Sequence, residues 1–142
     1  MVSDDPLLSG KTMTARLLKL AVIYLVIGMS LGLGMGISQN FLLHSVHAHV
    51  NLLGWASLAL AALVFHVFPA TARTRLATIW FWTYNLSVPI GLGGLALFLL
   101  GYTWAEPVLI VGQLGIWAAG AMFAINVLWA LRASDQRGAE GA

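Results

Sequence analysis

Long stretches without charge are the feature of this sequence that most constrains its fold. No Asp, Glu, Lys or Arg lies between Lys19 and Arg73, between Arg75 and Glu106, or between Glu106 and Arg132, which leaves gaps of 53, 30 and 25 residues. A helix that crosses a bilayer needs about 20 mostly apolar residues. The first gap has room for two such helices and each of the others for one, so the sequence predicts four membrane spans.

The composition agrees with this prediction. The chain has 142 residues, of which 60% are hydrophobic and 8% charged, whereas an ordinary soluble domain is about 25% charged. We therefore expect an all-α fold, an integral four-helix bundle in the lipid bilayer that forms a single domain over residues 1–142. The polar residues 1–16 are expected to form a tail. The spans are expected at about residues 17–37, 47–68, 76–100 and 108–131.

The distribution of Lys and Arg predicts the orientation in the membrane. All seven basic residues lie in the N-terminal segment, the second loop or the C-terminal segment, and none lies in residues 38–46 or 101–107. By the positive-inside rule both termini are cytoplasmic and the first and third loops face outward, as in a bacterial-type inner (plasma) membrane. Basic residues divided among three short segments form no nucleic-acid-binding face.

Three histidines lie at the outer start of the second span, at His44, His47 and His49. Imidazoles in or near hydrocarbon are costly without partners, and neutral imidazole is the commonest metal ligand. At about 100° per residue, His44 and His47 share a face, whereas His49 lies about 160° from His47. A regular helix would not hold one metal ion with all three. His49 is expected to point elsewhere, into the bundle, with Asn51 at a different angle.

The absence of cysteine narrows the chemistry of such a site. Without Cys, disulfides, thiolate-bound clusters and CxxCH-type haem attachment are all excluded. One hypothesis is a copper or zinc site at the outer surface, with ligands from His44, His47, His49 and Glu106. Glu106 is expected in the third loop, on the same outer side as the histidines, where it can also be a solvated residue with no such role.

Small and polar residues inside the spans have structural interpretations. Gly28, Gly32 and Gly36 recur at a spacing of four, which favours close helix contact, although the same stripe could leave room for a flat cofactor. His66 is expected at the inner interface, too far from His49 to share a metal ion with it. Interhelical hydrogen bonds are expected from the three intramembrane amides, Asn85, Gln113 and Asn126.

The stretch His47–Trp55, which reads HAHVNLLGW, continues to Phe65–Pro69 and then to the pair Phe81–Trp82. This pattern resembles subunit I of the haem-copper oxidase superfamily, nearest its nitric oxide reductase branch, and especially the small stand-alone proteins called cytochrome-c oxidase subunit I-like. The resemblance covers roughly residues 45–85. It implies that His49 is an axial ligand of a low-spin haem b and that Asn51 is the Asn of the family motif.

The chain also departs from this family. The full-length subunit has about a dozen spans, and its later helices carry the second haem ligand and the ligands of the binuclear centre. None of these helices exists here, and the third and fourth spans contain no His. The chain alone therefore cannot assemble the binuclear centre. A sixth ligand of a bound haem would come from His44 or His47, from another subunit, or not at all.

The leading hypothesis is a membrane protein that binds haem b through His49, with His47 and Asn51 beside it, for electron transfer or gas sensing. A homo-oligomer is expected, because a neighbouring copy could supply a ligand, and a redox partner protein or a quinone is the expected electron partner. The alternatives are the copper or zinc site and a packing or assembly protein without a cofactor. No residue is assigned a catalytic role.

Overall fold

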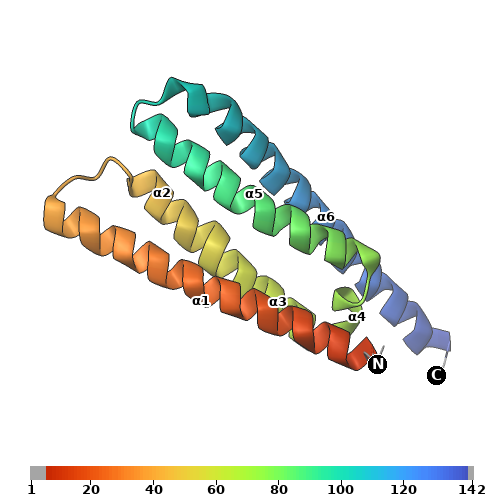
Figure 1. The fold of residues 1–142 in the computed structure, drawn as a ribbon. Coiled ribbons are helices and arrows are strands. Elements are labelled where there is room, and N and C mark those ends of the chain that lie inside the picture. The colour runs from red at the N-terminus through yellow and green to blue at the C-terminus, as the bar shows by residue number, and fades with distance from the viewer. Residues whose placement is uncertain (1–5, 141–142) are drawn as a thin grey trace, which may run out of the picture.

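The fold is all-helical over the part of the chain that the structure describes, residues 6–140, with side chains described for residues 12–132 (Figure 1). In this computed structural model, four helical segments are long and apolar enough to cross a membrane, as the sequence predicts. They are α1 (Pro6–Ser38), the continuous segment α2 (His44–His49), η1 (Val50–Ala56) and α3 (Ser57–Val67), then α5 (Arg75–Leu99) and α6 (Glu106–Glu140). We call residues 44–67 span 2. Short turns join these helices at α4 (Pro69–Ala72) and η2 (Thr103–Ala105).

Two expectations about helix ends are wrong. Residues 6–16 belong to α1 and are not a tail, since the helix begins at Pro6. The side chain of Leu17, the first residue of the predicted span, is completely buried, so α1 packs on the rest of the bundle from the start of its apolar run. Glu106 is not in a loop but is the first residue of α6, where its carboxylate faces the positive end of the helix dipole.

The bundle consists of two antiparallel hairpins. Figure 1 shows α1 beside span 2 in one hairpin and α5 beside α6 in the other. The backbones of α5 and α6 approach closely where Gly91 and Gly112 meet. A Cβ added to Gly112 would collide with the backbone of Gly91, and one added to Gly94 would lie 2.6 Å from the backbone nitrogen of Leu109. Such close contact lets helices pack by dispersion in a lipid environment.

The two hairpins meet at an aromatic core. Phe65 of α3 packs edge-on against Trp80 of α5, with ring centroids 5.5 Å apart. Phe123 of α6 lies 5.0 Å from Trp80 and 5.9 Å from Phe65. Phe65 and Trp80 are 2% and 3% exposed. Three helices from both hairpins therefore share one desolvated cluster.

A polar link joins the hairpins beyond this core. The buried Asn126 of α6 donates from its Nδ2 to the carbonyl of Thr71, at 2.8 Å, and accepts from the hydroxyl of Thr74. The same Thr74 hydroxyl caps α5 by accepting from the Ala77 amide, at 2.9 Å. All polar atoms of the Asn126 side chain thus have partners, as expected for an amide buried in the bundle.

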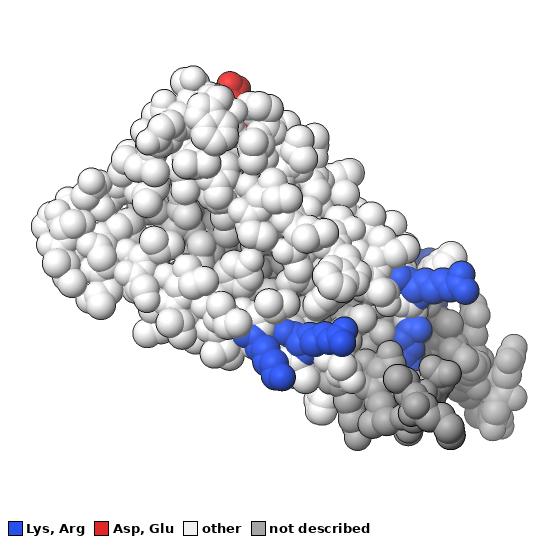
Figure 2. All heavy atoms as spheres, in the orientation of Figure 1, with Lys and Arg blue, Asp and Glu red and all other residues white. Residues whose placement is uncertain are grey.

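Charged side chains lie at opposite ends of the bundle. Figure 2 shows Lys and Arg gathered at the end that holds the chain termini, and an acidic side chain at the other end. The basic residues with described side chains are Arg16, Lys19, Arg73, Arg75 and Arg132, and the acidic one is Glu106. We call the end with the Lys and Arg side chains the basic end. We call the opposite end, which holds Glu106 and the start of span 2 at His44, the histidine end.

Candidate functional site

His47 lies in the contact between α2 and α1. Its Nδ1 is 2.8 Å from the carbonyl oxygen of Gly28, and its half-buried ring covers Gly32 so closely that a Cβ added there would lie 2.8 Å from Cε1. Because a carbonyl oxygen only accepts, Nδ1 carries the proton and donates it. The Nε2 atom keeps its lone pair, which is the tautomer of a histidine that can bind a metal.

Asn51 occupies the next turn of the same face. Its Nδ2 donates to the carbonyl of His47, at 2.9 Å, and its amide packs against Gly28, where an added Cβ would lie 2.5 Å from the side chain. Gly28 and Gly32 therefore form a recess that holds an imidazole and an amide. Gly36, the third glycine of the predicted stripe, has open space where a Cβ would be, and its carbonyl accepts from the Gln39 side chain at 2.6 Å.

His49 does not point into the bundle, contrary to the expectation from the sequence. Its side chain is exposed, and its Nδ1 is 2.7 Å from the carbonyl oxygen of Ser45, one turn earlier in the same helix. It is His47 that faces inward, with Asn51 on the same side. The reason is that the start of span 2 packs into the bundle with the face that carries Val46, His47 and Val50, where His47 contacts α1, and this turns the opposite face outward.

His44 is exposed, and its ring contacts only residues close to it in sequence. Its Nδ1 lies 3.1 Å from the carbonyl oxygen of Phe41, and its Nε2 lies 3.4 Å from the Ser45 hydroxyl. The three imidazoles thus share one local arrangement, with Nδ1 held by a backbone carbonyl, but they face different directions. Within the described residues no three His, Asp or Glu side chains come together to hold one metal ion, and Glu106 is exposed at the start of α6.

A π-helix, η1, directly follows the histidines and is not predicted from the sequence. In η1 the wider turn leaves carbonyl groups displaced from the regular helical pattern. The Leu52 carbonyl accepts from the Ser57 hydroxyl, at 2.8 Å, and the Leu53 carbonyl accepts from the Tyr84 hydroxyl of α5, at 3.0 Å. Gly54 lies directly under the ring of Tyr24 of α1. The sequence feature that accompanies this π-helix is Gly54 with Ser57 three residues later. Many ordinary helices contain the same pair, so it does not predict a π-helix.

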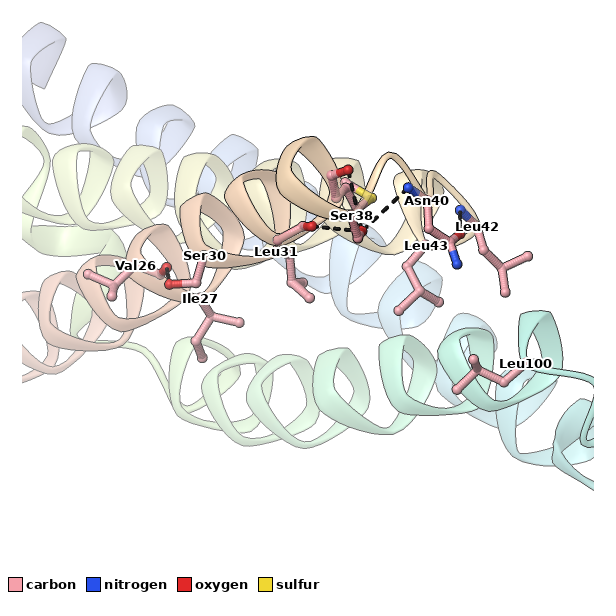
Figure 3. A pocket seen from close by; sticks show the side chains of 11 residues that line it. Val26, Ile27, Ser30, Leu31, Ser38, Asn40, Leu42, Leu43 and Leu100 are labelled. Carbon is pink, nitrogen blue, oxygen red and sulfur yellow. Dashed lines mark hydrogen bonds between the residues drawn. The ribbon is translucent and has the colours of Figure 1, made fainter.

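Two apolar crevices open between the hairpins. The larger, of about 530 Å³, lies at the histidine end between α1 and the Leu100 end of α5 (Figure 3). Its polar side chains are bonded internally, for example Ser30 to the Val26 carbonyl and Ser38 to the Gly34 carbonyl, both at 2.8 Å. The smaller, of about 350 Å³, lies between span 2, α5 and α6 and has Trp80 and Tyr84 in its wall. None of the histidines lines either crevice.

The remaining predicted polar residues have different environments. His66 is exposed near the end of α3, at the opposite end of span 2 from the histidine cluster. Of the three intramembrane amides, Asn126 forms the expected bonds between helices, whereas Asn85 bonds within its own helix, to the Phe81 carbonyl at 2.7 Å. Gln113 makes no hydrogen bond to any described residue and is exposed.

No protein-family model matches this chain, and neither does any curated protein or solved structure. The resemblance to the haem-copper oxidase subunit therefore depends on the quoted residues of span 2 and α5 alone.

Proposed function

We propose that this chain is a membrane-bound b-type haem protein in which His49 is an axial ligand, and that it serves electron transfer or gas sensing. The observation that carries the proposal is the state of the His49 imidazole. Its Nδ1 is bonded to the Ser45 carbonyl, and its Nε2 makes no bond to any described residue and is exposed. A second bond that fixes the ring and leaves Nε2 basic is typical of histidines that bind metals.

The neighbouring residues suit a haem site in different ways. His47 and Asn51 would act as positioning residues, since they attach the start of span 2 to Gly28 and Gly32 and so hold the face that carries His49. The π-helix η1 supports the same interpretation, because such segments occur frequently at functional sites. When bound, a haem would supply a one-electron couple or a position for a gas ligand.

The exposure of His49 favours a site at the side of the bundle and not inside it. A haem held there by one chain would have one face open to lipid, and no second imidazole of the same chain lies on that face. A partner surface is therefore needed to cover it, which favours the predicted homo-oligomer or a redox partner protein. A quinone remains the alternative electron partner.

We further propose that the histidine end faces the outside of a bacterial-type inner membrane, with both termini in the cytoplasm. The collection of five described basic side chains at one end supports this orientation, because Lys and Arg are retained on the cytoplasmic side.

The test is optical spectroscopy on protein expressed with ample haem and purified in mild detergent. The unsubstituted protein should show a b-type spectrum after reduction with dithionite, and His49→Ala should lose it. His66→Ala is the matched control, since His66 is also an exposed histidine of span 2 but lies at its other end. It should keep the spectrum unchanged.

Metal analysis of the same samples separates the alternatives. A His49→Ala protein with an unaltered haem spectrum would refute His49 as a ligand. Stoichiometric copper or zinc without haem would favour the site at His44 and His47, with Glu106 as a candidate ligand. Protein that holds neither would leave a packing or assembly protein as the better description.

A further inference from the structure

The exposed side of α6 carries an unusual combination of residues. Gln113, Trp117, Gly120 and Ala124 follow one another at spacings of four, three and four, which places them on one face of the helix. All four are exposed, and the opposite side of α6 packs on α5. We call these four residues the Gln113 face.

Trp117 lies at a depth where an exposed tryptophan is unexpected. The charged residues that bracket the apolar part of α6 are Glu106 and Arg132, and Trp117 lies two residues from their midpoint. It is nonetheless 75% exposed. Tryptophan is enriched at the two membrane interfaces, where its indole N–H reaches water or headgroups. Near the middle of the bilayer that N–H has no such partner.

Gln113 also places polar groups inside the apolar part of α6 where they have no partner among the described residues, and it has more of them than Trp117. It lies seven residues, or about 10 Å, inside the start of α6. Its amide has two donors and an acceptor oxygen, yet it bonds to no described residue, whereas Asn85 and Asn126 are both bonded. A polar group left without a partner in hydrocarbon is costly, and lipid chains cannot supply one.

We propose that the Gln113 face is the surface at which a second copy of this chain docks. Two copies inserted in the same orientation carry Gln113 at the same depth, so a two-fold axis along the membrane normal brings the two amides together. Each amide can then donate to the oxygen of the other, because the group is electrostatically complementary to itself. No other partner has its complementary group placed at this depth by symmetry alone.

The rest of the face fits this arrangement. Gly120 has open space where a Cβ would be, and Ala124 follows one turn deeper, which is the small-xxx-small pattern that lets membrane helices approach closely. Trp117 lies between these small residues and Gln113 and would be covered in the dimer. The inference stands independently of haem, since none of the four residues is among the candidate haem-site residues.

Cross-linking in membranes provides the first test. The chain has no cysteine, so one introduced thiol reports on one position. Ala124→Cys should form a disulfide-linked dimer on mild oxidation. The control Ala118→Cys is the same substitution about 120° away around α6 and should cross-link at least fivefold less. Equal yields at the two positions, or none at Ala124→Cys, would overturn the proposal.

Energy transfer between labelled copies in phosphatidylcholine vesicles provides the second test. Diluting the protein with lipid gives a dimer dissociation constant, which Gln113→Leu should raise about eightfold through loss of two interhelical hydrogen bonds. Gln113→Leu places an apolar side chain toward lipid and should leave the fold intact. Leu114→Val, beside the face, should not change the constant. An unchanged constant for Gln113→Leu, or monomer at every dilution, would refute the interface.

Discussion

Gly91 and Gly112 bring two backbones together in the α5–α6 hairpin, whereas Gly28 and Gly32 leave room for polar side chains in the hairpin of α1 and span 2. Gly91 and Gly112 meet backbone to backbone. Gly28 and Gly32 instead receive the side chains of Asn51 and His47. Gly28 and Gly32 lie on one helix and face side chains of the other, whereas Gly91 and Gly112 lie on two different helices and face each other.

This difference gives the two hairpins different roles, with the α5–α6 hairpin as the scaffold and the hairpin of α1 and span 2 as the place of the candidate site. A contact between two backbones has no side chain that can yield, so the positions of Gly91 and Gly112 tolerate little change. The same interface also holds one polar side chain, since the Ser87 hydroxyl of α5 packs against Gly115 of α6. The contact at His47 has an imidazole that is hydrogen-bonded through Nδ1 and whose Nε2 bonds to no described residue. The first hairpin therefore carries the side chains of the proposed site, and the second carries the closest backbone contact between glycines and the Gln113 face.

The largest expected effect is at the α5–α6 contact. Gly112→Ala should destabilise the protein by about 3 kcal/mol, because the new methyl group would collide with the backbone of Gly91, which cannot move without separating the helices. Unfolding in mixed micelles with increasing SDS measures the loss. Gly93→Ala is the control, since open space surrounds that position. Similar losses for the two variants would remove the distinction between a backbone contact and a free surface.

The same substitution in the first hairpin should cost less. Gly32→Ala displaces the tip of the His47 ring and weakens its hydrogen bond to the Gly28 carbonyl, for a loss of about 1 kcal/mol. The His47 ring nitrogens should also shift in ¹⁵N NMR, which a purely steric effect on the backbone would not produce. Gly36→Ala, with nothing near its Cα, should change neither quantity. If Gly32→Ala costs as much as Gly112→Ala, the two hairpins pack alike after all.

The smallest expected effect concerns the hydrogen bond from Tyr84 of α5 to span 2. Tyr84→Phe removes the hydroxyl that donates to the Leu53 carbonyl of η1, and should cost about 0.6 kcal/mol, the average for hydrogen bonds between membrane helices. Amide exchange in residues 50–56 should increase, because that carbonyl helps to hold the π-helix. Tyr24→Phe is the control, since its hydroxyl bonds to no described residue. Faster exchange in both variants would indicate a general loosening of the bundle.

Charge spacing and hydropathy predict much of this fold. The uncharged gaps correctly indicate four membrane-length helices, since the cost of burying charge in hydrocarbon acts on each segment separately. The same reasoning fails at helix ends. It takes residues 6–16 for a tail and places Glu106 in a loop, because polar residues can continue a helix beyond the membrane.

The candidate site is less accessible to such reasoning. The spacing of His44, His47 and His49 correctly separates the last two around a helix, but it does not show which one faces α1. The π-helix is equally hidden, since it depends on contacts of η1 with Tyr24 and Tyr84 from two other helices. The spacing of residues along one helix shows which of them share a face. It does not show which residues of another helix will contact that face.

Composition and local periodicity thus establish four helices long and apolar enough to cross a membrane, with three imidazoles at one end, because hydrophobicity and helical repeat are properties of single segments. The packing of α1 against span 2 decided that His47 is held in a glycine recess and that His49 is turned outward. The packing of α6 on α5 decided that Gln113 bonds to no described residue. These outcomes depend on which faces of different helices meet. That choice is made by the fit of side chains between helices, such as an imidazole over Gly32 or a backbone against Gly112.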